Sequence, residues 1–190
     1  MKFDNIEEIA ANSFRDFHCK GLDYVCLLRR PQLTLKAYFF EGDVSRAPEA
    51  VVPHDHRYDF YTTVLCGSVM NREFRESSVG EVYQRFSYET PLNGGDGFAW
   101  ECETRLQHLG TKTFVPSTGY FSEAAGLHTI SIADPLTVLL LAQFEDKVDG
   151  PTSAFRAGDG RQEPSLDGLY SKPDEDYVKR RLRQLRGLGI

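Results

Sequence analysis

Two histidines stand one residue apart in the stretch Val52-Pro-His54-Asp-His56-Arg-Tyr-Asp-Phe-Tyr-Thr-Thr-Val-Leu-Cys-Gly67. Residues two apart on a strand point to the same side, so an extended chain presents both imidazoles to one cavity. A second β-like segment, Gly126-Leu-His128-Thr-Ile-Ser-Ile132, brings a third histidine into an apolar strand. Three neutral imidazoles can form a facial metal site that leaves positions open for water, substrate or dioxygen. The pattern therefore predicts a metal centre on His54, His56 and His128.

The region around these histidines reads as all-β. From Tyr24 to about Phe144, short stretches rich in Val, Thr, Tyr, Phe and Leu alternate with turn formers. The turn formers are Glu41-Gly-Asp43, Asn93-Gly-Gly-Asp-Gly97 and Ser117-Thr-Gly119. Repeated helices between the strands are missing, which argues against a parallel α/β sheet and favours a sandwich or a jelly roll. We expect one domain over residues 1–190.

Both ends of the chain carry a helical pattern. Apolar residues recur at helical spacing between Phe3 and Phe17, which predicts an N-terminal helix. The segment 146–172 is rich in Gly, Pro, Ser and Asp and is expected to be a loop or a lid. Acidic residues followed by basic ones predict a C-terminal helix over 173–190, whose basic side is expected to be solvated. One face of this helix would carry Val178, Leu182 and Leu185.

Composition narrows the class of protein. The chain has 190 residues, 41% of them hydrophobic and 26% charged, which is typical of a globular protein, and its net charge of −6 argues against nucleic-acid binding. The longest apolar run, Val138–Ala142, is far shorter than the roughly 20 residues that span a bilayer. The N-terminus resembles no signal peptide. The four cysteines form no C-x-x-C pair, so we expect reduced thiols and a cytoplasmic location. The expected partner is a small-molecule substrate.

The arrangement of His54, His56, Gly67 and His128 resembles the cupins. In that family H-x-H is followed by three or four residues, a Glu, six residues and a Gly, and another His comes about sixty to eighty residues later. The resemblance covers roughly residues 33–143. It implies a cupin double-stranded β-helix, that is, a jelly-roll barrel, here with short N- and C-terminal helices. It also implies one divalent metal ion, with Fe(II) favoured and Zn, Mn or Ni as alternatives.

The chain departs from the cupin motif at the carboxylate position. Phe60 stands where the Glu is expected, and Asp59 comes one residue earlier. Either the site has three histidines alone, or a shifted turn makes Asp59 a fourth ligand. An inward alternation that begins at Phe60 and continues to Cys66 favours three histidines, with Asp59 pointing outward. Cys66 would then be a small core residue or would bring its thiol near the ion.

Within the cupins, the chain resembles the thiol dioxygenases, which show an I-H-D-H and a G-L-H segment and bind iron(II) with three histidines. Their arginine for the substrate carboxylate corresponds in spacing to Arg29. Their supporting Ser, His and Tyr would fall near Leu141, Gln143 and Glu145, so cysteine is not expected as the substrate. Tyr58 and Tyr61 flank the ligand segment and are candidate catalytic hydroxyls.

Three functions compete at this stage. The first is a non-haem iron(II) dioxygenase acting on a small molecule. The second is a metal-dependent isomerase or lyase, and the third is a non-catalytic cupin that binds a small ligand. His18 and His108 lie outside the pattern and are expected to be structural or exposed. Pairing of two chains through sheet edges would give a homodimer.

Overall fold

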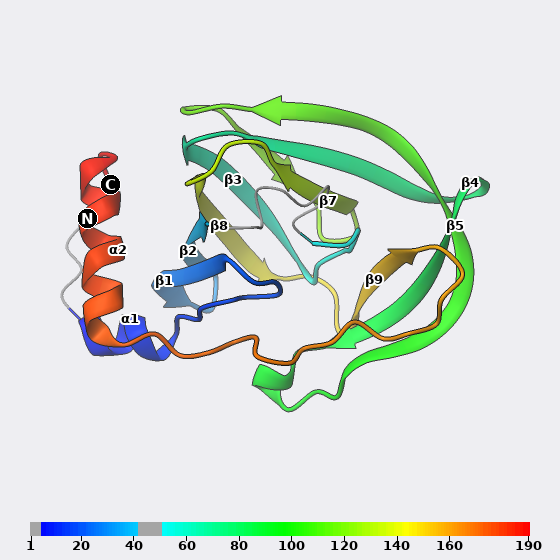
Figure 1. The fold of residues 1–190 in the computed structure, drawn as a ribbon, viewed down its shortest axis with the longest axis horizontal. Helices are drawn as coiled ribbons and strands as arrows, with labels where there is room; N and C mark the ends of the chain where they lie inside the picture. Colours follow the sequence, from blue (N-terminus) through cyan, green and yellow to red (C-terminus); the bar gives the residue numbers. More distant parts are fainter. Residues whose placement is uncertain (1–4, 42–50) are drawn as a thin grey trace.

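The computed structural model describes residues 5–41 and 51–190, which form an antiparallel β-sandwich with two α-helices and one short 3-10 helix (Figure 1). The strands are β1 (Leu22–Arg30), β2 (Leu33–Phe40), β3 (Tyr58–Cys66), β4 (Val69–Glu89), β5 (Gly97–Phe114), β6 (Gly119–Ser122), β7 (Leu127–Ile132), β8 (Val138–Asp146) and β9 (Thr152–Ala157). The helices are α1 (Ile6–Ala11), the short 3-10 helix η2 (Pro91–Asn93) and α2 (Glu175–Gly187). The expected all-β class with terminal helices is confirmed.

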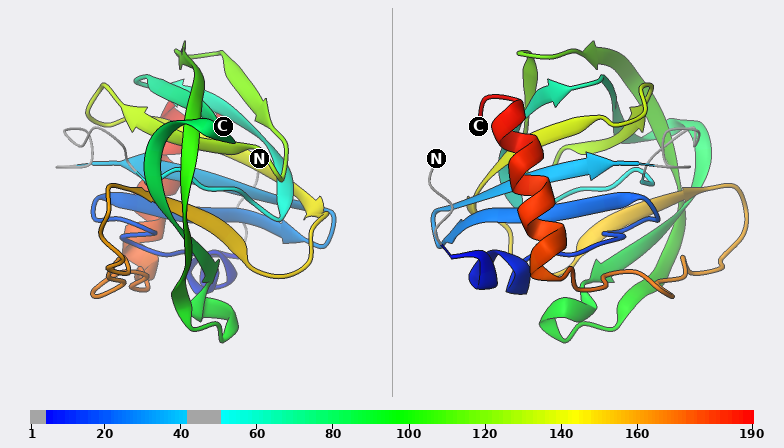
Figure 2. Two further views of the ribbon diagram at one scale, coloured as in Figure 1. Left: turned by 90° about the vertical axis from the view of Figure 1, so that its right-hand side faces the viewer. Right: turned by 60° about the vertical axis from the view of Figure 1, so that its left-hand side comes forward.

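The strands divide into two sheets. The first has the order β1-β2-β8-β3-β6, and the second has the order β5-β4-β7, with β9 also paired to β4. The long β4–β5 hairpin curls across the end of the molecule opposite α2 (Figures 1 and 2). Because these two strands pair with each other along most of their length, they extend the second sheet and do not join it to the first. In the described part of the chain the expected jelly-roll barrel is therefore an open two-sheet sandwich and does not close.

The alternation of β3 holds for three of its four expected inward residues. Phe60 and Val64 are buried in the core between the sheets, and Thr62 is buried beside them. The register then shifts between Val64 and Cys66. Cys66 packs instead with the apolar cluster under α2, so its thiol faces away from the site.

The turn from β3 to β4 explains why a glycine stands at position 67. The φ of Gly67, +73°, lies in the left-handed region, which residues with a Cβ avoid. A Cβ at this position would come within 2.3 Å of the Thr137 Oγ1 atom. Only glycine fits the turn from β3 to β4.

Helix α2 covers the outer face of the first sheet, as the right-hand view of Figure 2 shows. Asp174 caps its N-terminus by accepting a hydrogen bond from the backbone N–H of Tyr177. Its apolar face is the predicted one: Val178, Leu182 and Leu185 are buried against β1, β2 and β8. The helix itself begins two residues later and ends three residues earlier than predicted.

The basic side of α2 differs from its expected solvated state at one position. Arg181 is buried and donates hydrogen bonds to Tyr177, Asp23 and Glu41. The guanidinium has carboxylate partners on the neighbouring sheet, and these compensate for its burial. Arg181 therefore ties α2 to the first sheet.

Three expectations about the ends and turns are changed or lie outside the described residues. The N-terminal helix is limited to α1, while residues 3 and 4 of its expected range are not described. Two of the three residues of the expected turn Glu41–Asp43 are likewise not described. The segment 146–172 contains a strand, β9, which pairs with β4. None of the described helices is long and apolar enough to cross a membrane.

Candidate metal centre

Backbone pairing brings the three predicted histidines together. His54, just before β3, and His128, on β7, exchange both backbone hydrogen bonds, at 2.9 and 3.0 Å. His56 is fixed two residues later, where its N–H donates to the Ala124 carbonyl oxygen at 2.8 Å. Pairing across a bridge places side chains on one face, so the three imidazoles lie beside one another.

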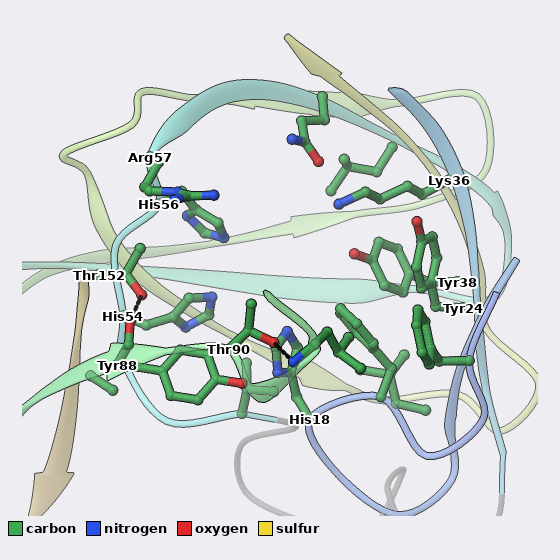
Figure 3. Close-up of a pocket in the computed structure, with 18 of the residues that line it drawn as sticks. His18, Tyr24, Lys36, Tyr38, His54, His56, Arg57, Tyr88, Thr90 and Thr152 are labelled. Atoms are coloured by element: carbon green, nitrogen blue, oxygen red, sulfur yellow. Dashed lines mark hydrogen bonds between the residues drawn. The ribbon is translucent and has the colours of Figure 1, made fainter. Parts of the chain in front are cut away.

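The imidazoles form a compact group at the wall of a cavity of about 1250 Å³. Figure 3 shows two of them, His54 and His56. The ring centroid of His54 lies 4.6 Å from that of His56 and 5.0 Å from that of His128, and the remaining pair is 5.2 Å apart. Each residue offers one ligand nitrogen, and these nitrogens lie within 4.8 Å of one another. Such a group can hold one divalent ion.

Hydrogen bonds set two of the imidazoles in the tautomer that metal ligands need. His54 donates its Nδ1 proton to the Val52 carbonyl oxygen at 2.8 Å. His128 donates its Nδ1 proton to Asn71 Oδ1 at 2.7 Å. In both rings the lone pair is thus left on Nε2, and the ring orientation is fixed.

The remaining nitrogens fit a metal. His128 Nε2 and His56 Nδ1 are buried and have no hydrogen-bond partner among the described residues. Unpaired buried polar atoms are costly, and a coordinated cation would satisfy His128 Nε2 directly. Burial is the main cause that lowers the pKa of all three histidines, so each is neutral and keeps a lone pair to donate near pH 7.

Asp59 and Phe60 take the places that the three-histidine interpretation predicts. Phe60 is buried, and its ring centroid lies 4.7 Å from that of His56 and 5.5 Å from that of His128. Asp59 accepts a hydrogen bond from the Ala124 backbone N–H at 2.9 Å and forms an ion pair with Lys147. These two contacts lower the pKa of Asp59, the Lys147 contact contributing most. Within the described chain, the metal-ligand group therefore contains three imidazoles and no carboxylate.

The two candidate tyrosines lie in different places. Tyr58 lines the cavity, and its ring centroid is 5.4 Å from that of His56. Tyr61 is 44% exposed and is paired across the strands with Phe121 on β6. The structure therefore brings Tyr58 to the site and leaves Tyr61 on the outer face.

Arg29 lies at the rim of the cavity. Its side chain is exposed, and Nη2 donates to the Tyr24 hydroxyl at 3.1 Å. Among the described residues, Arg29 makes no hydrogen bond to any of the three histidines. Its predicted role in substrate binding stays a prediction.

Sequence reasoning missed a cation inside the cavity. Lys36 on β2 is only 6% exposed, and it lines the cavity together with Thr34, Tyr38 and Phe40. These residues lie two apart on one strand and so share a face. The alternation could have identified Lys36 as an inward residue. A lysine is assigned to the surface by default, and this default concealed it.

A fourth histidine also lines the cavity, although the sequence placed it outside the pattern. His18 Nδ1 and the Tyr170 hydroxyl form a hydrogen bond of 2.9 Å, and the Tyr170 and Tyr88 hydroxyls are 2.7 Å apart. His18 is exposed, and the protein around its ring lowers its pKa, with desolvation as the largest cause. His18 and Tyr170 both have positive φ angles, 68° and 59°. Such backbone conformations depend on the tertiary structure and leave no signal in the sequence.

No protein-family model matches the chain, and no curated protein matches it. Several solved structures are similar at low identity. An RmlC-like cupin from Shewanella frigidimarina is 12% identical over 72% of this chain and 87% of that chain, with a TM-score of 0.40. KdgF from Halomonas sp. is 14% identical over 66% of this chain and 82% of that chain, with a TM-score of 0.38.

A third similar structure is that of Streptomyces albus HEPD with its substrate 2-hydroxyethylphosphonate and Fe(II) bound. It is 12% identical over 73% of this chain, with a TM-score of 0.43, and the match spans a quarter of that longer chain. This chain has a two-sheet β fold, with the H-x-H segment before β3 and the third histidine on β7.

Proposed function

We propose that this chain is a metal-dependent enzyme, a non-haem iron(II) dioxygenase that acts on a small molecule. One observation carries the proposal: three neutral imidazoles, with no carboxylate in their group, meet at the wall of a large cavity in the described part of the chain. A facial set of three protein ligands leaves positions open for a substrate and for dioxygen. Iron(II) bound there would supply the redox chemistry that the side chains lack.

The cavity residues supply binding and shielding. Aromatic side chains form part of its walls, with Tyr24, Tyr38, Phe60 and Tyr120 among them. Burial is the largest cause that raises the pKa of Tyr24, Tyr38 and Tyr120, so these hydroxyls stay protonated and can donate hydrogen bonds to a ligand. Such walls exclude water from a reacting molecule and orient it.

A second candidate function rests on the His18–Tyr170–Tyr88 contacts. These three groups form a hydrogen-bonded series that lines the same cavity. A series of this kind can hold a bound molecule by hydrogen bonds while a metal ion polarises it, as a metal-dependent isomerase or lyase requires. Zn, Mn or Ni would then serve on the same three histidines as a Lewis acid.

Oxygen uptake separates these functions. The protein is reconstituted anaerobically with iron(II) and then exposed to dioxygen with a panel of small acids, thiols, phenols and sugars. The proposal predicts uptake above the iron-only background with at least one compound, and no uptake by zinc-loaded protein or by the His128→Ala variant. Turnover without oxygen uptake would favour the isomerase or lyase. Binding without turnover would favour the non-catalytic cupin.

A further inference from the structure

Lys36 has an unusual position for a lysine. It lies in the middle of β2, the second strand of the first sheet, and is 6% exposed. Its neighbours Leu35 and Ala37 pack toward α2, so the strand directs Lys36 to the opposite side, into the cavity. Figure 3 shows the Lys36 side chain extending into the cavity toward the side on which His56 lies.

The contacts of Lys36 are two aromatic faces. Its Nζ atom lies 5.4 Å from the ring centroid of Tyr24 and 5.2 Å from that of Tyr58. Among the described residues, this ammonium group has no hydrogen-bond or ion-pair partner. Tyrosine rings stabilise a cation only partly, and they leave its three N–H donors unused.

The other basic side chains that line the cavity differ from Lys36 in this respect. Arg29 donates to the Tyr24 hydroxyl, Arg57 pairs with Asp146 at 3.2 Å, and Lys172 donates to the Ala11 and Ser13 carbonyl oxygens. Lys36 is thus the cation whose hydrogen-bonding capacity remains free within the described lining.

The acidic groups of the cavity do not compensate for Lys36. Asp55 accepts a hydrogen bond from the Ser153 backbone N–H at 2.7 Å, and Asp146 is the partner of Arg57. Glu89, the other acidic residue of the described lining, forms no ion pair with Lys36. An unpaired ammonium in a largely apolar cavity is costly, and an anion that enters the cavity would remove this cost.

We propose that Lys36 binds the carboxylate of a small organic acid and so defines the substrate class of the cavity. Tyr58 contacts both ends of the arrangement, since its ring lies against the Lys36 ammonium and against the His56 imidazole. An acid of a few carbons held by Lys36 would therefore direct its remaining end along Tyr58 toward the three histidines. A single ammonium between two tyrosine rings suits one carboxylate better than a doubly charged phosphate.

The role of Lys36 as a substrate anchor rests on the proposed function, but its preference for a carboxylate can be measured without turnover. The probes are matched pairs: propionate and propionamide, lactate and lactamide, succinate and succinamide. Their dissociation constants are measured by titration calorimetry on metal-free and on zinc-loaded protein. The wild-type protein is compared with Lys36→Met, with Lys36→Gln and with the control Lys112→Met, which removes an exposed lysine of β5.

The expected result is that at least one acid binds wild-type and Lys112→Met protein about 10- to 100-fold more tightly than its amide. In both Lys36 variants this preference falls to within about twofold of unity, while thermal unfolding shows that they remain folded. If no acid is preferred over its amide, or if the preference persists in folded Lys36 variants, the proposal is overturned.

The titrations of metal-free and of zinc-loaded protein also separate this proposal from the proposed function. In metal-free protein the preference depends on Lys36 alone. A wild-type chain that takes up no metal yet prefers acids would contradict the enzyme and retain the carboxylate site. A chain that binds iron and consumes oxygen but shows no preference dependent on Lys36 would retain the enzyme and contradict the carboxylate site.

Discussion

The orientation of His128 depends on one buried amide. Asn71 on β4 is 3% exposed, and its Oδ1 accepts the Nδ1 proton of His128 at 2.7 Å. Partners of this kind fix the tautomer and the angle of a ligating imidazole. We predict that Asn71→Leu lowers metal affinity by about 10- to 100-fold, as measured by competition with a chromophoric chelator. Unchanged affinity in the folded variant would show that Asn71 does not position the ring.

Asp59 is predicted to support the fold and not the metal. Its carboxylate is held by Lys147 and by the Ala124 backbone N–H, so Asp59→Asn should retain the full metal content of the wild type. The lowered pKa of Asp59 gives the sign of its effect on stability. The stabilisation is present above the pKa of the unfolded chain, about 4, and is lost as the pH falls through the lower folded value.

The measurement is urea unfolding of the wild type and of Asp59→Asn between pH 3 and pH 7. The wild type should be the more stable protein at pH 7, and the difference should shrink below about pH 4. Loss of metal from Asp59→Asn would instead identify Asp59 as a fourth ligand.

Residue-level prediction succeeded where a position had one dominant constraint. Gly67 and Phe60 were assigned from their spacing after the H-x-H pair, and the turn and the apolar core require them there. Lys36 and His18 were missed for different reasons. Lys36 is buried although lysines usually lie on the surface. The position of His18 depends on tertiary contacts with Tyr170.

Strand β9 is the element that the sequence did not reveal, and it clamps the ligand segment. Its polar residues Thr152 and Ser153, next to Gly150-Pro151, give the segment a loop-like composition. In the fold it pairs with β4 on one side and bonds to the H-x-H segment on the other, through Asp55 N–H to the Ser153 carbonyl oxygen and Phe155 N–H to the Pro53 carbonyl oxygen. The expected loop thus forms part of the site's support.

This clamp can be tested at Asp55, which stands between the two ligand histidines. Its Oδ1 accepts the Ser153 backbone N–H at 2.7 Å. We predict that Asp55→Ala costs about 1–2 kcal/mol of stability and lowers metal affinity by about tenfold, because the segment that holds both imidazoles loses an anchor. Chemical unfolding and chelator competition measure the two effects. Asp159→Ala, an exposed control, should change neither quantity. If Asp55→Ala lowers the stability by the expected amount but leaves the metal affinity unchanged, β9 does not support the metal site through Asp55.

At the scale of the whole molecule, the cavity lies between segments far apart in the sequence. Its lining comes from residues before β1, from β2, from the H-x-H segment, from β7 and β8, and from the chain after β9. Alternation and turn formers predicted the two-sheet β fold and the terminal helices. They did not predict the length of the β4–β5 hairpin, since its strands are broken by polar and glycine residues that resemble turns, such as Ser77, Ser78 and Gly80. For the same reason the sequence did not reveal that the two sheets of the described residues stay open.

The homodimer remains a prediction at this scale. Strands β1 and β6 are the edges of the first sheet, and Phe121 on β6 is 52% exposed next to Tyr61. Unpaired edges with exposed apolar side chains favour association. Light scattering after size exclusion should give twice the 21.5 kDa of the chain, and Phe121→Lys should give the monomer mass. A monomer at all concentrations of the wild type would remove this prediction.

The central claim is that His54, His56 and His128 hold one divalent ion. Elemental analysis of the purified chain, before and after exposure to iron(II) or zinc and desalting, tests it most directly. The account predicts close to one equivalent per chain in the wild type. In folded His56→Ala and His128→Ala variants it predicts less than about a tenth of an equivalent, because two imidazoles bind such an ion far more weakly than three. A wild-type chain that takes up no first-row transition metal, or variants that retain a full equivalent, would contradict it.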